Sequence, residues 1–155
     1  MNPIKIEVNS VVNLSPKVIC SIILDTSQWK KFEGYSILPG IKKAEFEKRT
    51  DTVLGSRIKV YNTDGSTHIE EIIDWDVNKK VVLKFQEFNS PLKYFASHFI
   101  EEWNFVASAH RTEIRRIMKM YPKNIFGFIL LRPISLLMKK ALVKNLEQLN
   151  LSSIN

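Results

Sequence analysis

Residues 4–34, IKIEVNSVVNLSPKVICSIILDTSQWKKFEG, carry the signals that decide the fold. The first of them alternate apolar and polar side chains, which is typical of a strand with one buried and one wet face. Ser15 followed by Pro16 predicts a helix start, because the Ser oxygen can cap free amides and proline at the first helical position loses no useful donor. Asp25 offers a second cap before Trp29, which predicts a second, shorter helix.

In the rest of the chain, the spacing of apolar residues changes once, from a strand pattern to a helix pattern. Residues 41–121 alternate between strand patterns and turn signals, which predicts six strands in succession. The Asp64-Gly65 pair is the strongest hairpin signal, since glycine tolerates the positive φ that a tight turn requires. Apolar residues then recur every three or four positions, which predicts a long C-terminal helix. Pro133 removes a backbone hydrogen bond from it, so we expect a kink or a break between residues 125–131 and 134–149.

Together these elements predict an α+β fold in which the long helix covers the buried face of one sheet. The Ser15-Pro16 helix start, Asp25 before Trp29 and Phe32, and the Asp64-Gly65 hairpin resemble the START-like or helix-grip superfamily (SRPBCC), which includes polyketide cyclases/dehydratases and lipid-transport proteins. The resemblance covers nearly the whole chain and rests on element order rather than on a catalytic motif. It implies a seven-stranded antiparallel sheet wrapped around the long C-terminal helix, two short helices after strand one, and an apolar cavity between sheet and helix.

The sequence predicts one domain over residues 1–155, since no linker, repeat or low-complexity tract divides the chain, and the resemblance implies that this domain binds a ligand. The 23 Lys and Arg against 16 Asp and Glu give a net charge of +7, which is compatible with anionic partners or surfaces. Cys20 is the one cysteine, so an internal disulfide is excluded. The first residues lack the apolar block of a signal peptide, and the longest apolar run, residues 125–131, is too short to span a membrane. We therefore expect a cytoplasmic protein.

Alternation along the strands, and the period of the C-terminal helix, assign side chains to the space between sheet and helix. Most of them are large and apolar, which suits an irregular hydrophobic ligand and equally suits an ordinary packed core. The residues predicted to contact a ligand are Ile58, Val60, Ile69, Glu71, Ile73, Trp75, Leu83, Phe85, Phe99, Glu101, Trp103, Ile114, Arg116, Met118, Ile134, Leu137, Met138 and Ala141.

Glu71, Glu101 and Arg116 are the exceptions in this set, because an ionised group facing an apolar interior is costly unless it is paired or hydrated. Either a Glu–Arg pair orients the polar head of a ligand, or a bulge shifts the alternation and all three side chains reach solvent. Glu101 and Glu102 are adjacent, so in a regular strand one of them points inward.

We expect neither a metal nor another cofactor. His68, His98 and His110 lie in separate segments without ligand spacing, and alternation places His68 and His98 on the outer face of the sheet. The sequence contains no nucleophile elbow, phosphate-binding loop or zinc-binding helix motif.

These observations favour binding or transport of a hydrophobic or amphipathic small molecule, such as a lipid, an isoprenoid or quinone, or a polyketide-like compound. The alternative is a cyclase/dehydratase-type enzyme with Glu71 and Glu101 as acid and base; no other catalytic residue is assigned. A third hypothesis uses the basic surface, where Lys139, Lys140 and Lys144 beside apolar residues suit transient contact with an anionic membrane. Nucleic-acid binding is disfavoured, because most aromatic side chains are assigned inward. The sequence leaves the oligomeric state open.

Overall fold

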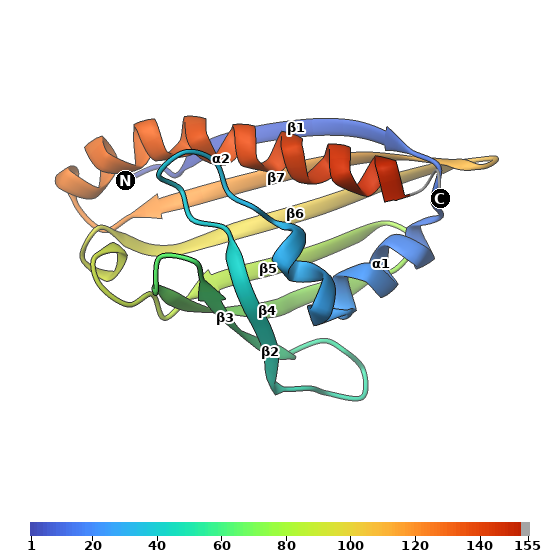
Figure 1. Cartoon of the computed structure of the whole chain (residues 1–155), viewed down its shortest axis with the longest axis horizontal. Coiled ribbons are helices and arrows are strands. Elements are labelled where there is room, and N and C mark those ends of the chain that lie inside the picture. The colour runs from blue at the N-terminus through green and yellow to red at the C-terminus, as the bar shows by residue number, and fades with distance from the viewer. Residues whose placement is uncertain (153–155) are drawn as a thin grey trace.

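The computed structural model describes residues 1–152, and this part of the chain has the predicted α+β helix-grip architecture (Figure 1). Its strands form one seven-stranded antiparallel sheet in the order β1-β7-β6-β5-β4-β3-β2, and the long helix α2 lies across the concave face. The strands are β1 (Ile4–Val12), β2 (Ile41–Lys48), β3 (Arg57–Asn62), β4 (Thr67–Asp76), β5 (Lys80–Gln86), β6 (Ala96–Ser108) and β7 (Arg111–Pro122). The helices are α1 (Pro16–Leu24), the 3-10 helices η1 (Thr26–Lys31) and η2 (Leu92–Tyr94), and α2 (Ile125–Ser152).

The packed core lies between α2 and one side of the sheet. α2 makes its closest packing with β1 and then with β7, rather than with the middle strands. Fully buried apolar side chains from both layers meet there, which removes their surface from water and holds the helix in place. They include Val12, Ile114, Met118, Met120, Leu131, Leu142 and Leu146.

The two short helices after β1 begin at the caps expected from the sequence. The backbone N–H of Val18 donates to Ser15 Oγ at 3.3 Å, and Pro16 is the first helical residue of α1. The backbone N–H of Ser27 donates to the Asp25 carboxylate at 3.1 Å, which caps η1. These side-chain acceptors satisfy amides that have no partner within the helix, so the chain turns sharply after each strand or helix end.

The β3–β4 hairpin is also as predicted. Gly65 adopts a φ of +88°, which side chains other than glycine rarely tolerate, and Asp64 accepts from the backbone N–H of Ser66 at 2.9 Å. The hairpin therefore has both the conformational freedom and the local hydrogen bond that a tight turn needs.

Of the kink or break expected at Pro133, the break is wrong, because α2 continues through this residue as one helix. The proline removes the hydrogen bond to the carbonyl of Ile129, four residues earlier. Both residues lie on the exposed side of the helix, where water can satisfy that carbonyl, so the helix tolerates the loss. Among the helices of residues 1–152, none is long and apolar enough to cross a membrane.

The predicted faces of β4 need a correction as well. Ile72 pairs with Leu83 and Trp75 with Val81, and the register shifts between the two pairs, so Ile73 is the extra residue of a bulge. Trp75 faces the core as predicted. The residues of β4 before the bulge are displaced by one position from the predicted alternation, so each of them lies on the face opposite to the predicted one.

As a result, His68, Glu70 and Ile72 face inward. Ile69, Glu71 and Ile73 point to the other side of the sheet, although alternation placed them inward.

Candidate functional site

A cavity of about 620 Å³ lies between the sheet and α2. Its walls come from α1, η1, the loop before β2, strands β2 to β7, η2 and α2. Ten of the eighteen side chains expected in a site line this cavity: Leu83, Phe85, Phe99, Glu101, Trp103, Arg116, Met118, Ile134, Leu137 and Met138. The concave face is therefore hollow beside the middle strands, and most of its lining is aliphatic or aromatic.

The other eight expected residues do not line the cavity. Ile58, Val60, Trp75, Ile114 and Ala141 pack in the interior, where they complete the core. Glu71 lies on the opposite face, where Gln86 Nε2 donates to its carboxylate at 3.0 Å. Ile69 and Ile73 share that face because of the bulge in β4.

Several cavity residues were not expected from the sequence. His68 and Glu70 enter through the shifted face of β4, which corrects the outward assignment of His68. Asn145 comes from α2, one helical turn beyond the cavity residue Leu142, and its position follows from the helical period. Further apolar lining comes from loops and short helices, for which the sequence has no periodic signal: Trp29, Phe32, Ile37, Leu38, Phe88, Leu92 and Phe95.

A buried ion pair joins β6 and β7 inside the cavity. Arg116 Nη2 donates to the two carboxylate oxygens of Glu101 at 3.1 and 3.3 Å, and the two side chains are only 7% and 3% exposed. Trp103 Nε1 also donates to Glu101, at 2.6 Å, and Arg116 Nη1 donates to Asn145 Oδ1 at 2.7 Å. Glu102 points outward towards Lys119, with 3.5 Å between the charged atoms. The pair is therefore compensated by hydrogen bonds from the sheet and from α2.

The guanidinium of Arg116 has little capacity left for a ligand. Its plane lies over the Trp103 ring, with 4.1 Å from Cζ to the ring centroid. Nη1 and Nη2 both donate within the protein, and Nε is fully buried without a hydrogen-bond partner among residues 1–152. Arg116 thus fixes Glu101 and α2 rather than presenting an open cationic surface to the cavity.

A second polar pair lies on β4. His68 Nε2 is 3.0 Å from Glu70 Oε1, and His68 Nδ1 is 3.4 Å from the amide nitrogen of Asn62. The His68 ring stacks on Phe85, with 5.3 Å between ring centroids. Both members of the pair are buried, and both line the cavity.

Burial raises the pKa of the Glu70 carboxyl above its ordinary value of 4.5. The hydrogen bond and charge of His68 oppose this effect, the charge of Glu101 adds to it, and Arg116 opposes it. Since desolvation is the largest cause, the site favours a protonated Glu70 more than water does. Two buried carboxyl groups of the cavity therefore have unlike surroundings, Glu101 paired with a cation and Glu70 beside a histidine.

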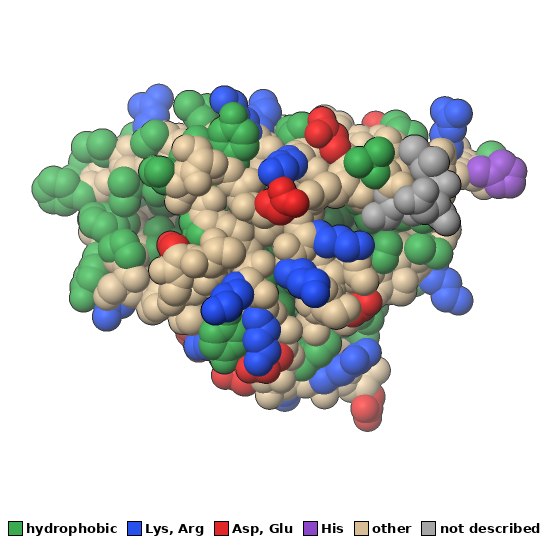
Figure 2. Space-filling view, in the orientation of Figure 1, with side chains coloured by type: hydrophobic (Ala, Val, Ile, Leu, Met, Phe, Trp, Pro, Cys, Tyr) green, Lys and Arg blue, Asp and Glu red, His purple; other side chains and the backbone are tan. Residues whose placement is uncertain are grey.

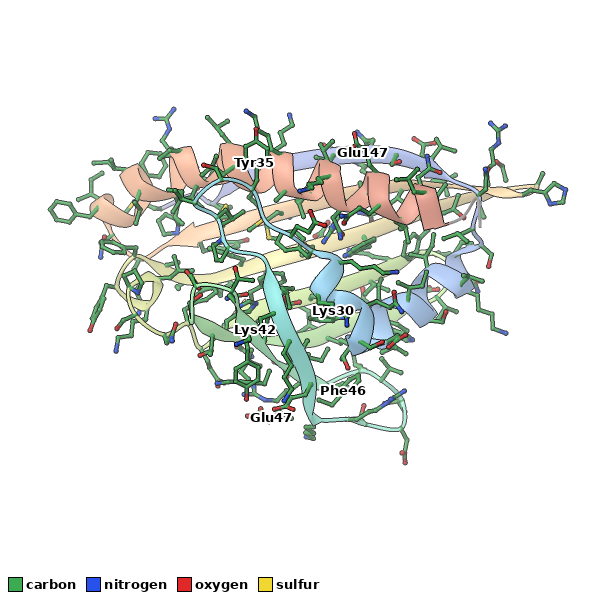
Figure 3. All side chains as sticks on the ribbon, in the orientation of Figure 1. Lys30, Tyr35, Lys42, Phe46, Glu47 and Glu147 are labelled. Carbon is green, nitrogen blue, oxygen red and sulfur yellow. The ribbon has the colours of Figure 1, made fainter. Side chains whose placement is uncertain are left out.

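The loop after η1 forms the wall of the cavity that faces solvent. Lys144 Nζ is 2.6 Å from the carboxylate of Glu33, and Lys140 Nζ lies 5.1 Å from the centroid of the Tyr35 ring. Figure 3 shows Tyr35 against α2. Ile37, in the same loop, lines the cavity and is also 83% exposed, so the cavity reaches the surface here.

The curved sheet gripping α2, with short helices after β1, defines the helix-grip fold. A START superfamily protein from Mycobacterium smegmatis is similar, with a TM-score of 0.72 and 14% identity over 96% of this chain and 97% of that chain. Major latex-like protein 151 from Panax ginseng has a TM-score of 0.68 and 11% identity, covering 100% of both chains. A protein from Thermus thermophilus has a TM-score of 0.72 and 15% identity over 97% of each chain.

No protein-family model and no curated protein matches the sequence. The likeness to solved structures at these identities establishes the fold, and the chemistry of the site has to be argued from the residues of this chain. Within residues 1–152, no three His, Cys, Asp or Glu side chains are arranged to hold a metal ion.

Replacing Arg116 by Met should lower the free energy of unfolding by about 3 kcal/mol, because Glu101 would remain buried without its cation. Changing Glu101 to Gln in the same chain should recover part of that loss, since the unpaired charge is removed. Urea unfolding of the wild type, the two single variants and the double variant measures the coupling. Simple additivity of the two single losses would contradict the pairing.

Replacing Glu70 by Gln should change how stability depends on pH. The pKa of Glu70 is raised in the folded state, so above about pH 4.5 the unfolded chain binds fewer protons than the folded chain does. The free energy of unfolding of the wild type therefore falls as the pH rises through this range. The difference in unfolding free energy should therefore shift in favour of Glu70→Gln as the pH rises from 4 to 8. Thermal unfolding across this range measures it. Glu71→Gln, on the opposite face, is the matched control, and the same trend in that variant would contradict the assignment.

Proposed function

We propose that this protein binds or transports a hydrophobic or amphipathic small molecule, such as a lipid, an isoprenoid or quinone, or a polyketide-like compound. The observation that carries the proposal is the cavity of about 620 Å³ beside α2, lined mainly by apolar side chains. Sites for small organic ligands have volumes of about 300 to 1,000 Å³ and combine apolar walls with a few polar groups. This cavity has both properties.

The apolar walls supply affinity in this proposal. Phe85, Phe99, Met118 and Met138 come from three strands and from α2, so they surround a guest from different sides. Each CH₂ group of a ligand that leaves water contributes about 0.8 kcal/mol. Methionine side chains adapt to irregular shapes, which suits a ligand without flat or repeating surfaces.

The polar groups select the head of the ligand. Arg116 already donates to Glu101 and Asn145, so a ligand carboxylate beside it meets two buried carboxyl groups. The exposed cation of the lining is Lys31 of η1. Glu70 Oε1 lies 3.0 Å from His68 Nε2, and the second oxygen of Glu70 has no hydrogen-bond partner among residues 1–152. A head group that donates hydrogen bonds, such as a hydroxyl or an amine, therefore fits this end of the cavity better than an anionic one.

Filling part of the cavity with a larger side chain should weaken binding without unfolding the protein. Met138→Trp places an indole in the cavity, whereas Leu136→Trp, on the same helix and 64% exposed, places it in solvent. Titration with the neutral fluorescent probe N-phenyl-1-naphthylamine should show about tenfold weaker binding for Met138→Trp and wild-type binding for Leu136→Trp. Equal affinities of all three proteins, with circular dichroism showing them folded, would contradict the proposed site.

The natural guest is best sought in the protein purified from its own cells. Native mass spectrometry followed by organic extraction identifies what copurifies. A lipid or quinone mass, lost in Met138→Trp and kept in Leu136→Trp, supports the same cavity.

A cyclase/dehydratase-type enzyme is the second candidate function, and the polar groups of β4 favour it. Glu71 cannot act in the cavity, because it lies on the other face. Glu70, beside His68, takes its place as the second carboxyl group next to Glu101. Two carboxyl groups in unlike surroundings are a usual arrangement for acid and base roles in one site.

The carrier and enzyme hypotheses differ in how they respond to Glu70→Gln and Glu101→Gln. For a carrier, the affinity for N-phenyl-1-naphthylamine should stay within about threefold of wild type, since the apolar walls are unchanged. For an enzyme, turnover of a polyketide-like substrate should fall at least about 100-fold, because a proton-transfer group is lost. Parallel binding and product assays separate the two, and Glu71→Gln is the control for loss of a carboxylate outside the cavity.

A further inference from the structure

We propose that the end of the molecule where α2 begins docks on an anionic lipid bilayer. Four large apolar side chains of this end form an apolar tip: Tyr94, Ile125, Phe126 and Ile129, which are 58%, 56%, 69% and 61% exposed. Figure 2 shows hydrophobic side chains gathered at this end of the molecule. An exposed apolar cluster of this kind on a protein surface marks a contact with a partner or a membrane.

The apolar tip is built on a tightly packed platform. Asn124 Nδ2 donates to the carbonyl of Tyr94 at 3.1 Å, and the backbone N–H of Lys123 donates to the carbonyl of Phe95 at 2.8 Å. A Cβ atom added to Gly127 would lie 2.0 Å from that same carbonyl oxygen, so only glycine permits this approach of α2 to the segment after η2. The exposed side chains are therefore held together on adjoining elements.

Basic side chains flank the apolar tip. Lys93 and Lys123 adjoin it, and Arg132 follows it on α2, with Cζ 5.6 Å from the Phe128 ring centroid. The sequence contains no Asp or Glu within residues 88–100 or 114–146, so η2 and the part of α2 up to residue 146 carry only positive charge.

This combination selects a bilayer over other occupants. An anionic bilayer offers negative head groups above an apolar layer, which matches basic side chains around exposed apolar ones. A second copy of the chain would bring two positive rims together, and an acidic partner protein would leave the apolar tip without a counterpart. We choose the bilayer because its head groups match the basic side chains and its apolar layer matches the exposed apolar ones.

The apolar tip also adjoins the cavity. Leu92 and Phe95 line the cavity from the η2 segment, and Leu130 and Ile134 line it from α2 directly after Ile129. Docking through the tip therefore places this end of the cavity at the membrane surface. The docking itself does not depend on what the cavity binds, so either proposal stands if the other fails.

Co-sedimentation of the full chain with lipid vesicles tests the docking. The protein should bind phosphatidylcholine vesicles containing phosphatidylserine at least about tenfold more tightly than pure phosphatidylcholine vesicles, and added salt should weaken binding. Phe126→Asp with Ile129→Asp should reduce binding about tenfold or more, because charged side chains replace the apolar ones that enter the interface. Val106→Asp is the matched control, since Val106 is 64% exposed near the β6–β7 turn at the opposite end of the molecule.

A tryptophan introduced into the apolar tip reports docking by a gain of fluorescence signal, so the test does not depend only on variants that lose binding. Phe126→Trp should show a blue-shifted fluorescence increment with phosphatidylserine-containing vesicles and quenching by brominated lipids, whereas Val106→Trp should show neither. Absence of vesicle binding by the wild type, or equal loss in Val106→Asp, overturns the proposal. Self-association of the wild type that is lost in the Phe126→Asp, Ile129→Asp variant, without vesicle binding, assigns the tip to a second copy and also overturns it.

Discussion

A single helix is too narrow to cover the concave face of a seven-stranded sheet, and the cavity results from this difference in width. Strands about 4.8 Å apart make a sheet about 29 Å across, whereas a helix with its side chains is about 10 Å wide. α2 packs against β1 and β7, so the middle strands need another cover. α1, η1 and the loop carrying Tyr35 close that side, and the cavity is the space left between the two covers.

Polar groups in this space are tolerated because they satisfy one another across elements. Glu101 on β6, Arg116 on β7 and Asn145 on α2 form one connected set of hydrogen bonds, so burial of the charge also ties the helix to the sheet. His68 and Glu70 on β4 form a separate pair that leaves one carboxylate oxygen of Glu70 without a hydrogen-bond partner among residues 1–152. The first set bonds α2 to the sheet, whereas the second joins two residues of one strand and leaves a carboxyl oxygen of Glu70 unbonded among residues 1–152.

The sequence predicted the element order, the caps and the inward position of Glu101 and Arg116, because those signals are local or strictly alternating. β4 was ambiguous, since both of its faces combine apolar and acidic residues: one face has Ile69, Glu71 and Ile73, and the other has Glu70 and Ile72. Alternation cannot choose between two such faces, and only the pairing partners show the bulge. The loop residues of the cavity have no period at all, so their placement requires the tertiary fold.

The first turns of α2 lie between the cavity and the exposed apolar tip. Within α2, Leu130 and Ile134 face the cavity while Phe126 and Ile129 face solvent, so the first turns of the helix are apolar on both sides. A helix that only completed a core would carry polar groups on its outer face. Gly127 allows this doubly apolar segment to lie directly on the Phe95 carbonyl. The outer apolar face is thus fixed in place by the packing that closes this end of the cavity.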